Sequence, residues 1–191
     1  ITSGINSTLH LQSSSISNVK FEGILVAGTA KAYVNNVLIS NAGISGIVTY
    51  DSSRLTLPNA IINASNWANV AIFQNSAAVV NASMLISSNA NGLILLDNAT
   101  VKLQRTEIGY NTWGIMVFGR GLLSVHLSKI HNNSWDGIAV FENSKADITF
   151  TIIKFNRYGA TAYDNAELVI HNSTITNNLD FGIIGNSAVV V

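Results

Sequence analysis

The sequence predicts an all-β fold, a single-stranded right-handed parallel β-helix of about eight coils, each of 22–23 residues. Three observations lead to this prediction: a glycine column with fixed spacing, short bursts of alternating apolar residues, and polar turn residues at matching positions in successive coils. A fixed period of this size is typical of repeat proteins, in which each coil contacts only its neighbours. Parallel crossovers are almost always right-handed, which sets the hand.

The glycine column marks the same place in every coil. Its members are Gly23, Gly46, Asn69, Gly92, Gly114, Gly137, Gly159 and Gly182. Asn69 is the exception, and Asn is the non-glycine residue that best tolerates a positive φ angle. We therefore expect positive φ angles at this place in the coil.

Each coil contains three short stretches of alternating apolar residues. With the glycine as the first place, apolar residues occupy the second and fourth, the tenth and twelfth, and the seventeenth places. This alternation indicates three short strands per coil, because a helix would need a spacing near 3.6 residues. We expect three parallel sheets, in which the second-place residues stack directly above one another inside the coil. In four successive coils these are Ile24, Ile47, Val70 and Leu93.

The turns carry polar residues in register. The first turn contains Asp, Asn and Ser, as in Asp97-Asn98-Ala99, and these residues hydrogen-bond their own backbone in turns. One carboxylate per coil falls short of the six to eight oxygens that calcium needs, so we expect no metal and no cofactor. A later turn carries an asparagine, which we expect to pair its amide from coil to coil. The stacked asparagines are Asn111, Asn133, Asn156 and Asn178.

The segments Gly114–Asn133 and Gly137–Asn156 repeat one pattern, Gly-Ile-x-Val followed later by Ile-x-x-Asn. This pattern resembles the parallel β-helix repeat family, the pectate-lyase-like superfamily of secreted solenoids, and the resemblance covers the whole chain. It implies a secreted or cell-surface protein. Because the superfamily includes lyases, hydrolases, epimerases, tailspikes and adhesins, the resemblance does not choose a function.

Composition sets further bounds. We expect one domain, residues 1–191, with both ends cutting through a coil, as in part of a longer protein or an assembling unit. The zero net charge and scattered basic residues argue against a nucleic-acid partner, and the short apolar runs argue against a membrane span. Sequons for N-glycosylation make a glycoprotein possible, at Asn6, Asn63, Asn81, Asn98, Asn132 and Asn172.

Alternation places most aromatic side chains on or beside one outward flank. The expected binding residues there are Trp67, Trp113, Trp135, Tyr50, Phe73, Phe118, Phe141, Tyr158, Tyr163 and Phe181. An exposed apolar sheet face usually marks a partner site. Three interpretations remain: contacts with protein or with copies of the chain, a platform for stacking sugar rings, or ladders that only stiffen the sheet.

A second outward face is polar. The only catalytic candidates lie there, His126, Asp147 and His171, because lyases of the resembled superfamily often perform acid–base chemistry on such a sheet face. The two histidines should lie two coils apart, about 10 Å, with Asp147 one column over. Every turn is short, and no inserted loop builds a cleft around them, so a solvated polar face is the favoured interpretation.

The leading functional hypothesis is therefore a non-catalytic extracellular solenoid with a structural, adhesive or self-assembly role, using the aromatic flank for protein contacts. The first alternative is a polysaccharide-binding module that stacks sugars on the same flank. The second is a polysaccharide lyase or hydrolase, so enzymatic activity stays uncertain, with no activity the favoured interpretation.

Overall fold

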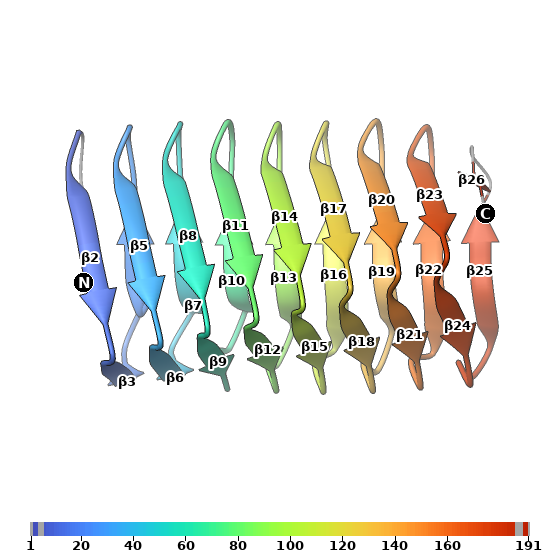
Figure 1. The fold of residues 1–191 in the computed structure, drawn as a ribbon, viewed down its shortest axis with the longest axis horizontal. Coiled ribbons are helices and arrows are strands. Elements are labelled where there is room, and N and C mark those ends of the chain that lie inside the picture. Colours follow the sequence, from blue (N-terminus) through green and yellow to red (C-terminus); the bar gives the residue numbers. More distant parts are fainter. Residues whose placement is uncertain (1, 4–5, 186–188, 191) are drawn as a thin grey trace.

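The computed structural model describes residues 2–3, 6–185 and 189–190, and it confirms the parallel β-helix. The strands stack coil upon coil into three parallel sheets, so the molecule is an elongated solenoid of about eight turns (Figure 1). Among the described residues no helix is present, and hence none that could cross a membrane.

We name the three sheets A, B and C in the order in which the chain enters them. Sheet A contains β1 (Thr2–Ser3), β4 (Ile24–Val26), β7 (Ser45–Thr49), β10 (Ala68–Ile72), β13 (Asn91–Leu95), β16 (Trp113–Val117), β19 (Asp136–Val140), β22 (Tyr158–Ala162) and β25 (Phe181–Gly185). Sheet B contains β2 (Thr8–Gln12), β5 (Lys31–Asn35), β8 (Arg54–Pro58), β11 (Ala77–Asn81), β14 (Thr100–Gln104), β17 (Leu122–His126), β20 (Lys145–Thr149), β23 (Glu167–His171) and β26 (Val189–Val190). Sheet C contains β3 (Ser15–Val19), β6 (Leu38–Ala42), β9 (Ile61–Asn63), β12 (Met84–Ile86), β15 (Glu107–Gly109), β18 (Lys129–His131), β21 (Ile152–Lys154) and β24 (Thr174–Thr176).

The register confirms the expected inner column. Ile24 pairs with Ile47, and Val70 pairs with both Ile47 and Leu93. All four side chains are fully buried in one continuous core that runs along the axis. The seventeenth-place residues are equally buried in the described coils from Ile39 to Ile153. Each coil therefore buries its apolar side chains against the coils on either side, as repeat architectures require.

The corners of the coil are made by residues in the left-handed backbone region. At the A–B corner these are often acids, with φ of 65° at Asp51 and 61° at Glu142. Their carboxylates accept hydrogen bonds from backbone N–H groups of the preceding coil, at Gly28 (2.8 Å) and Gly119 (2.7 Å). The acidic turn residues thus satisfy turn backbone, which explains their recurrence without a metal.

The expectation of positive φ in the glycine column is wrong. Among the described glycines only Gly28 and Gly119 have positive φ, and neither belongs to the column. Close approach is the real reason for glycine here. A Cβ added at Gly137 would lie 2.6 Å from the carbonyl oxygen of Gly159 and 2.8 Å from Nδ2 of Asn156. Both distances are shorter than those at which a Cβ contacts another atom, so the surrounding structure would have to shift.

The asparagine ladder forms as expected. The Nδ2 group of Asn133 donates to Oδ1 of Asn156 (2.9 Å), and Oδ1 of Asn133 accepts from the backbone N–H of Asn111 (3.1 Å). In the coil of Asn69 the ladder residue is Ser88 instead, and Asn69 fills the vacant space from the glycine column. Its Nδ2 donates to Oδ1 of Asn111 (3.3 Å) and to the carbonyl of Ile86 (3.0 Å). Asn69 therefore replaces the missing ladder amide.

Candidate binding face on sheet A

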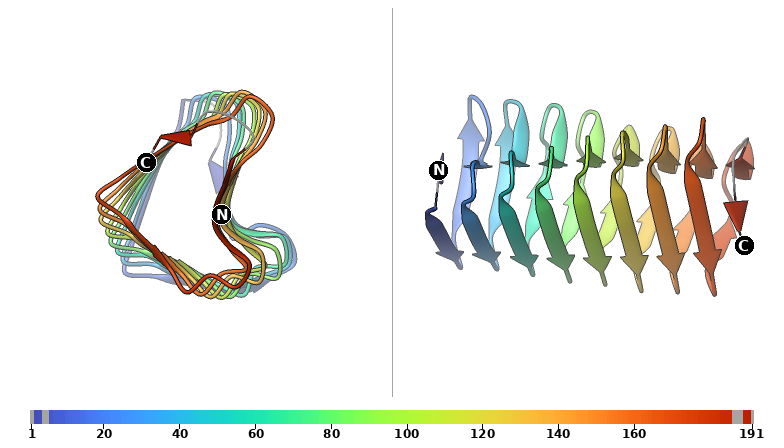
Figure 2. Two further views of the ribbon diagram at one scale, coloured as in Figure 1. Left: turned by 90° about the vertical axis from the view of Figure 1, so that its right-hand side faces the viewer. Right: turned by 90° about the horizontal axis from the view of Figure 1, so that it is seen from above.

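The outer face of sheet A lies in an inward bend of the coil. Seen along the axis, the backbone is recessed along this sheet, between the C–A turn that precedes it and the A–B turn that follows it (Figure 2). Side chains from the two edges of the sheet fill much of this recess. Two rows of aromatic residues, one at each edge, line it from coil to coil.

The first aromatic file lies at the end of the sheet A strands. It consists of Tyr50, Phe73, Phe118, Phe141 and Tyr163. Rings of neighbouring coils stack, with centroids 4.6 Å apart for Tyr50–Phe73 and 4.5 Å apart for Phe118–Phe141. Stacked rings one coil apart follow from the strand spacing of about 4.8 Å. Leu96 interrupts the file in the middle.

The second aromatic file lies at the start of the same strands. It consists of Trp67, Trp113, Trp135, Tyr158 and Phe181. Trp113 stacks on Trp135, with ring centroids 5.6 Å apart and an interplanar angle of 10°. Ala90 interrupts this file just before β13, and Leu96 interrupts the first file just after the same strand. All ten binding residues expected from the sequence thus lie on one face, in two files.

The floor between the files is more covered than the sequence suggests. Val48, Ala71 and Ala139 point outward from the sheet, yet they are at most 2% exposed. The flanking rings cover them: Trp67 and Phe73 stack across the floor with centroids 5.9 Å apart. This second, outer apolar cluster leaves the rings themselves half-buried, with Trp135 at 39% among the most exposed.

Buried polar side chains also lie on this floor, and sequence reasoning missed them. Asp136 is 2% exposed, and its Oδ1 accepts a hydrogen bond from the hydroxyl of Thr161 (2.6 Å). Burial raises the pKa of Asp136 to about 6, although the bond from Thr161 and the charge of Arg157 oppose this. The sequence carries little signal for this group, because its position in the sheet varies between Ser45, Ala68, Asn91 and Tyr158 in other coils.

Arg157 adds a cation to the same face. Its guanidinium lies over the ring of Trp135, 4.4 Å from the centroid, and its Nε donates to Asp180 (2.7 Å). The bond to Asp180 raises the pKa of Arg157. The arrangement holds a planar cation flat against the second aromatic file. Near its C-terminal end, the face therefore combines aromatic rings, one buried carboxyl group and one fixed guanidinium.

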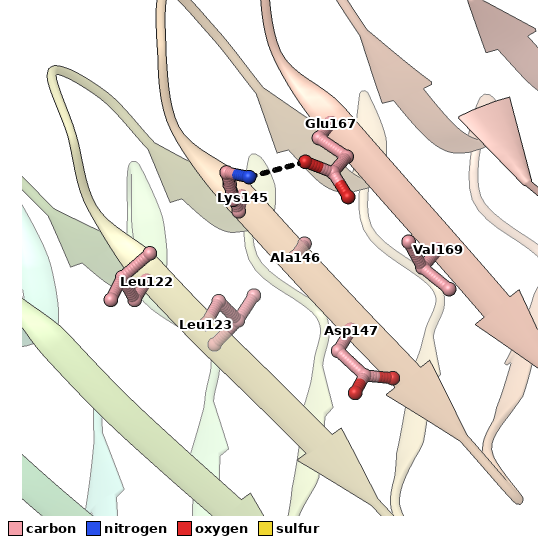
Figure 3. Close-up of a pocket in the computed structure, with 7 residues that line it drawn as sticks. All are labelled: Leu122, Leu123, Lys145, Ala146, Asp147, Glu167 and Val169. Carbon is pink, nitrogen blue, oxygen red and sulfur yellow. Dashed lines mark ion pairs between the residues drawn. The ribbon is translucent and has the colours of Figure 1, made fainter. Parts of the chain in front are cut away.

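The catalytic candidates on sheet B do not assemble into a site. His126 and His171 both pair with Thr149, so they lie two strands apart as expected. The Nδ1 atom of His126 is hydrogen-bonded to Thr149 Oγ1 (2.8 Å), whereas Asp147 lines a separate open hollow of about 300 Å³ (Figure 3). In that hollow the only ion pair drawn joins Lys145 to Glu167. In the described part of the chain, no hydrogen bond links Asp147 to either histidine.

A polar cluster on sheet C also escaped the sequence analysis. His131 is 2% exposed, and its Nε2 contacts Oε1 of Glu107 (2.6 Å), which also accepts from Lys129 (3.0 Å). Asn132 donates to Nδ1 of His131 (2.8 Å), so the proton of the neutral ring is on Nε2. Burial lowers the pKa of His131, and the imidazole fits because Gly109 has no Cβ at that point. Every polar atom of this imidazole is satisfied, which indicates a structural role.

The sequons occupy different surroundings. The side chains of Asn6, Asn98 and Asn172 are exposed, whereas those of Asn63, Asn81 and Asn132 are half-buried. Glycosylation of any of them stays a prediction.

Comparison with known proteins agrees with the fold. The chain matches the family described as a right handed beta helix region over residues 2–120 and 45–190, and it therefore belongs to the right-handed β-helix family. No curated protein sequence matches it.

Two solved structures of the periplasmic alginate epimerase AlgG have a similar fold. A double mutant of the periplasmic alginate epimerase AlgG is 12% identical, with a TM-score of 0.71 over 99% of this chain and 70% of that one. A second AlgG structure is 14% identical, with a TM-score of 0.60 over 93% of this chain and 51% of that one. The A-module of the Azotobacter vinelandii mannuronan C-5 epimerase AlgE6 is 11% identical, with a TM-score of 0.41 over 97% of this chain and 58% of that one. At these identities the likeness is one of fold.

Proposed function

We propose that this protein binds a polysaccharide along the outer face of sheet A. The observation that carries the proposal is the pair of aromatic files, which offers half-buried, flat rings on both sides of a recessed sheet. The rings of each file stack on one another, so they offer apolar edges to the recess, against which the C–H groups of a sugar pack while its hydroxyl groups stay free to bond polar neighbours. Trp113, Trp135 and Phe118 are the central rings of such a platform.

The regular spacing favours a polymer over a compact small molecule. One ring per coil repeats along the axis on each side, so an extended ligand can make the same contact several times. Repeated weak contacts add up through the high effective concentration of the next unit. Arg157, which is partly exposed, supplies a polar group that orients a ligand on a mainly apolar surface.

Retention on insoluble glycans tests the proposal. We expect the chain to be retained by at least one glycan, and Trp113→Ala to reduce retention at least tenfold because it removes the ring that stacks on Trp135. Tyr33→Ala is the matched control, since Tyr33 is an exposed aromatic residue on sheet B, away from the aromatic files, at 39%. Circular dichroism verifies that both variants fold. Failure of every glycan to retain the chain, or equal retention of the two variants, would contradict the proposal.

An adhesive or self-assembling role, the leading hypothesis from the sequence, has less support on this face. Neighbouring rings of the same chain already cover one another and the floor, which reduces the apolar area left for a protein partner. Light scattering over a wide concentration range separates the two roles, because self-assembly requires a mass that rises with concentration. A location outside the cytoplasm is part of the proposal, since polysaccharides of cell surfaces are found there.

Asp136 favours a second candidate function, a carbohydrate-active enzyme. A carboxyl group whose pKa lies near 6 exchanges protons readily around neutral pH, which suits a general acid or base. Asp136 lies on the same face as the aromatic files, unlike the candidates on sheet B, but it is 2% exposed, so this chemistry requires neighbouring side chains to move aside when a glycan binds. We expect Asp136→Asn to abolish turnover of a bound glycan if this chemistry operates, and to leave retention on the glycan within about threefold of the parent.

A further inference from the structure

The B–C corner of the coil holds one residue in the left-handed backbone region in every described coil. Their φ angles lie between 48° and 55°. These residues are Ser13, Asn36, Asn59, Ala82, Arg105, Leu127, Phe150 and Asn172. Figure 1 shows the corner where each long strand of sheet B meets the short strand of sheet C, as at β17 and β18.

Two successive coils place a bulky apolar residue at this corner. Asn36, Asn59 and Asn172 are of the type that tolerates a positive φ best, whereas Leu127 and Phe150 are bulky residues for which this conformation is strained. The bulky side chains do not improve the backbone hydrogen bonding at this corner. The N–H of Leu127 donates to the carbonyl of Thr149 (3.2 Å), and the N–H of Asn59 makes the equivalent bond to Asn81 (3.0 Å).

The same residues are also exposed to solvent. Leu127 is 47% exposed, Phe150 53% and the nearby Ile152 43%. Phe150 makes an edge-to-face contact with the ring of His126, but Leu127 and Phe150 lie outside the hydrophobic core. Tyr110 and Phe155 combine the same features at the C–A corner, so it is the hollow beside Leu127 and Phe150 that distinguishes this place. This corner is therefore a candidate for contact with another molecule.

A hollow of about 340 Å³ lies at this place. It is lined by Arg105, Thr106, Glu107, Leu127, Ser128, Lys129, Phe150 and Ile152. Lys129 pairs with Glu107, which leaves the positive charge of Arg105 uncompensated at the rim. Arg105 is exposed, and within the described ranges its side chain makes no hydrogen bond or ion pair. The hollow therefore combines an apolar wall with a free cation.

We propose that this hollow binds a segment of a partner protein in which acidic and apolar side chains alternate. An apolar side chain fills the concave space beside Leu127, Phe150 and Ile152, and a neighbouring carboxylate pairs with Arg105. A second copy of the same face does not fit, because Arg105 and Lys129 of one copy would then face the same two cations of the other. A flat lipid surface leaves a concave hollow unfilled. The site is separate from sheet A and independent of the polysaccharide proposal.

The test uses a double variant, Leu127→Asn with Phe150→Asn, which gives both corners the residue found at Asn59 and Asn172. A phage-displayed library of random peptides is selected on the parent chain. We expect the enriched peptides to combine Asp or Glu with Leu or Phe, and to bind the double variant at least tenfold more weakly. Arg105→Gln should weaken binding and reduce its dependence on salt. Ile61→Asn, another exposed apolar residue of sheet C, should bind like the parent.

Stability provides a second, independent readout. Because asparagine relieves the strained corners, the double variant should unfold at the same or a higher urea concentration than the parent. A lower concentration would mean that Leu127 and Phe150 support the fold, and it would overturn the argument. So would enrichment of basic peptides, no enrichment at all, or equal binding to the double variant. Binding to vesicles of phosphatidylserine and phosphatidylcholine that is lost in the double variant would assign the hollow to lipid instead.

Discussion

Asn69 and Ser88 exchange the usual roles of two positions in the coil, and restoring the usual arrangement is a stringent test of the fold. In the next coil the same positions hold Gly92 and Asn111, and a Cβ at Gly92 would lie 2.7 Å from Nδ2 of Asn111. The space between the two positions therefore holds one amide group, from either side. The perturbations are Asn69→Gly, Ser88→Asn and the two together.

The structure gives the magnitudes. Asn69→Gly removes two hydrogen bonds, to Ile86 and Asn111, each contributing about 1 kcal/mol. A glycine in a strand costs a further 0.5–1 kcal/mol or so. Removal of the buried, unpartnered Oδ1 of Asn69 returns about 1 kcal/mol, which leaves a net loss of about 1.5–2 kcal/mol. Ser88→Asn forces a second amide into the occupied space, at about 1–3 kcal/mol.

The double variant should be within about 1 kcal/mol of the parent, because it reproduces the arrangement at Gly92 and Asn111. The two losses would then fail to add by about 3 kcal/mol, at the upper end of couplings between contacting residues. Equilibrium urea unfolding followed by circular dichroism measures all four proteins, with equal slopes as the condition for comparison. Additive losses would refute the idea that the two side chains share one space.

Three further predictions concern stability. Gly137→Ala should destabilise the fold by about 1–3 kcal/mol, measured by urea unfolding, because the new Cβ meets the backbone of Gly159; unchanged stability would contradict the packing argument. Asp136 has a raised pKa, so the free energy of unfolding of the parent should fall by about 1–3 kcal/mol as the pH rises from about 4 to 6. The magnitude follows because a tenfold change in an ionisation constant corresponds to about 1.4 kcal/mol. Asp136→Asn should abolish this loss. His131 has a lowered pKa, so stability should fall as the pH drops below 6.5, and an identical acid profile for His131→Gln would exclude it as the cause.

The sequence predicted the architecture because each coil repeats the same short-range chemistry. Apolar alternation in each coil identified the strands and placed Ile24, Ile47 and Val70 on the inner face, and the register of the strands agrees with this. The asparagine ladder followed from the spacing of Asn133 and Asn156. The sequence analysis also placed the aromatic residues on one flank, since the direction of a side chain in a strand depends only on parity.

The sequence analysis did not predict several other contacts between coils. Positive φ was expected in the glycine column, whereas the structure shows close packing against the next coil. The burial of Asp136 depends on neighbours in other coils, such as Thr161, which no single coil encodes in its own pattern. The contact of His131 also depends on another coil, because its partner Glu107 lies in the preceding coil.

Local sequence by itself determined the period, the three strands of each coil and the sense in which each side chain points, because these follow from backbone geometry over a few residues. Only the stacked tertiary structure decided how far each outward side chain is covered, which polar groups meet, and where the strained corner at Leu127 and Phe150 borders a hollow. Those properties arise from neighbours about 23 residues away in the chain and one strand spacing away in space.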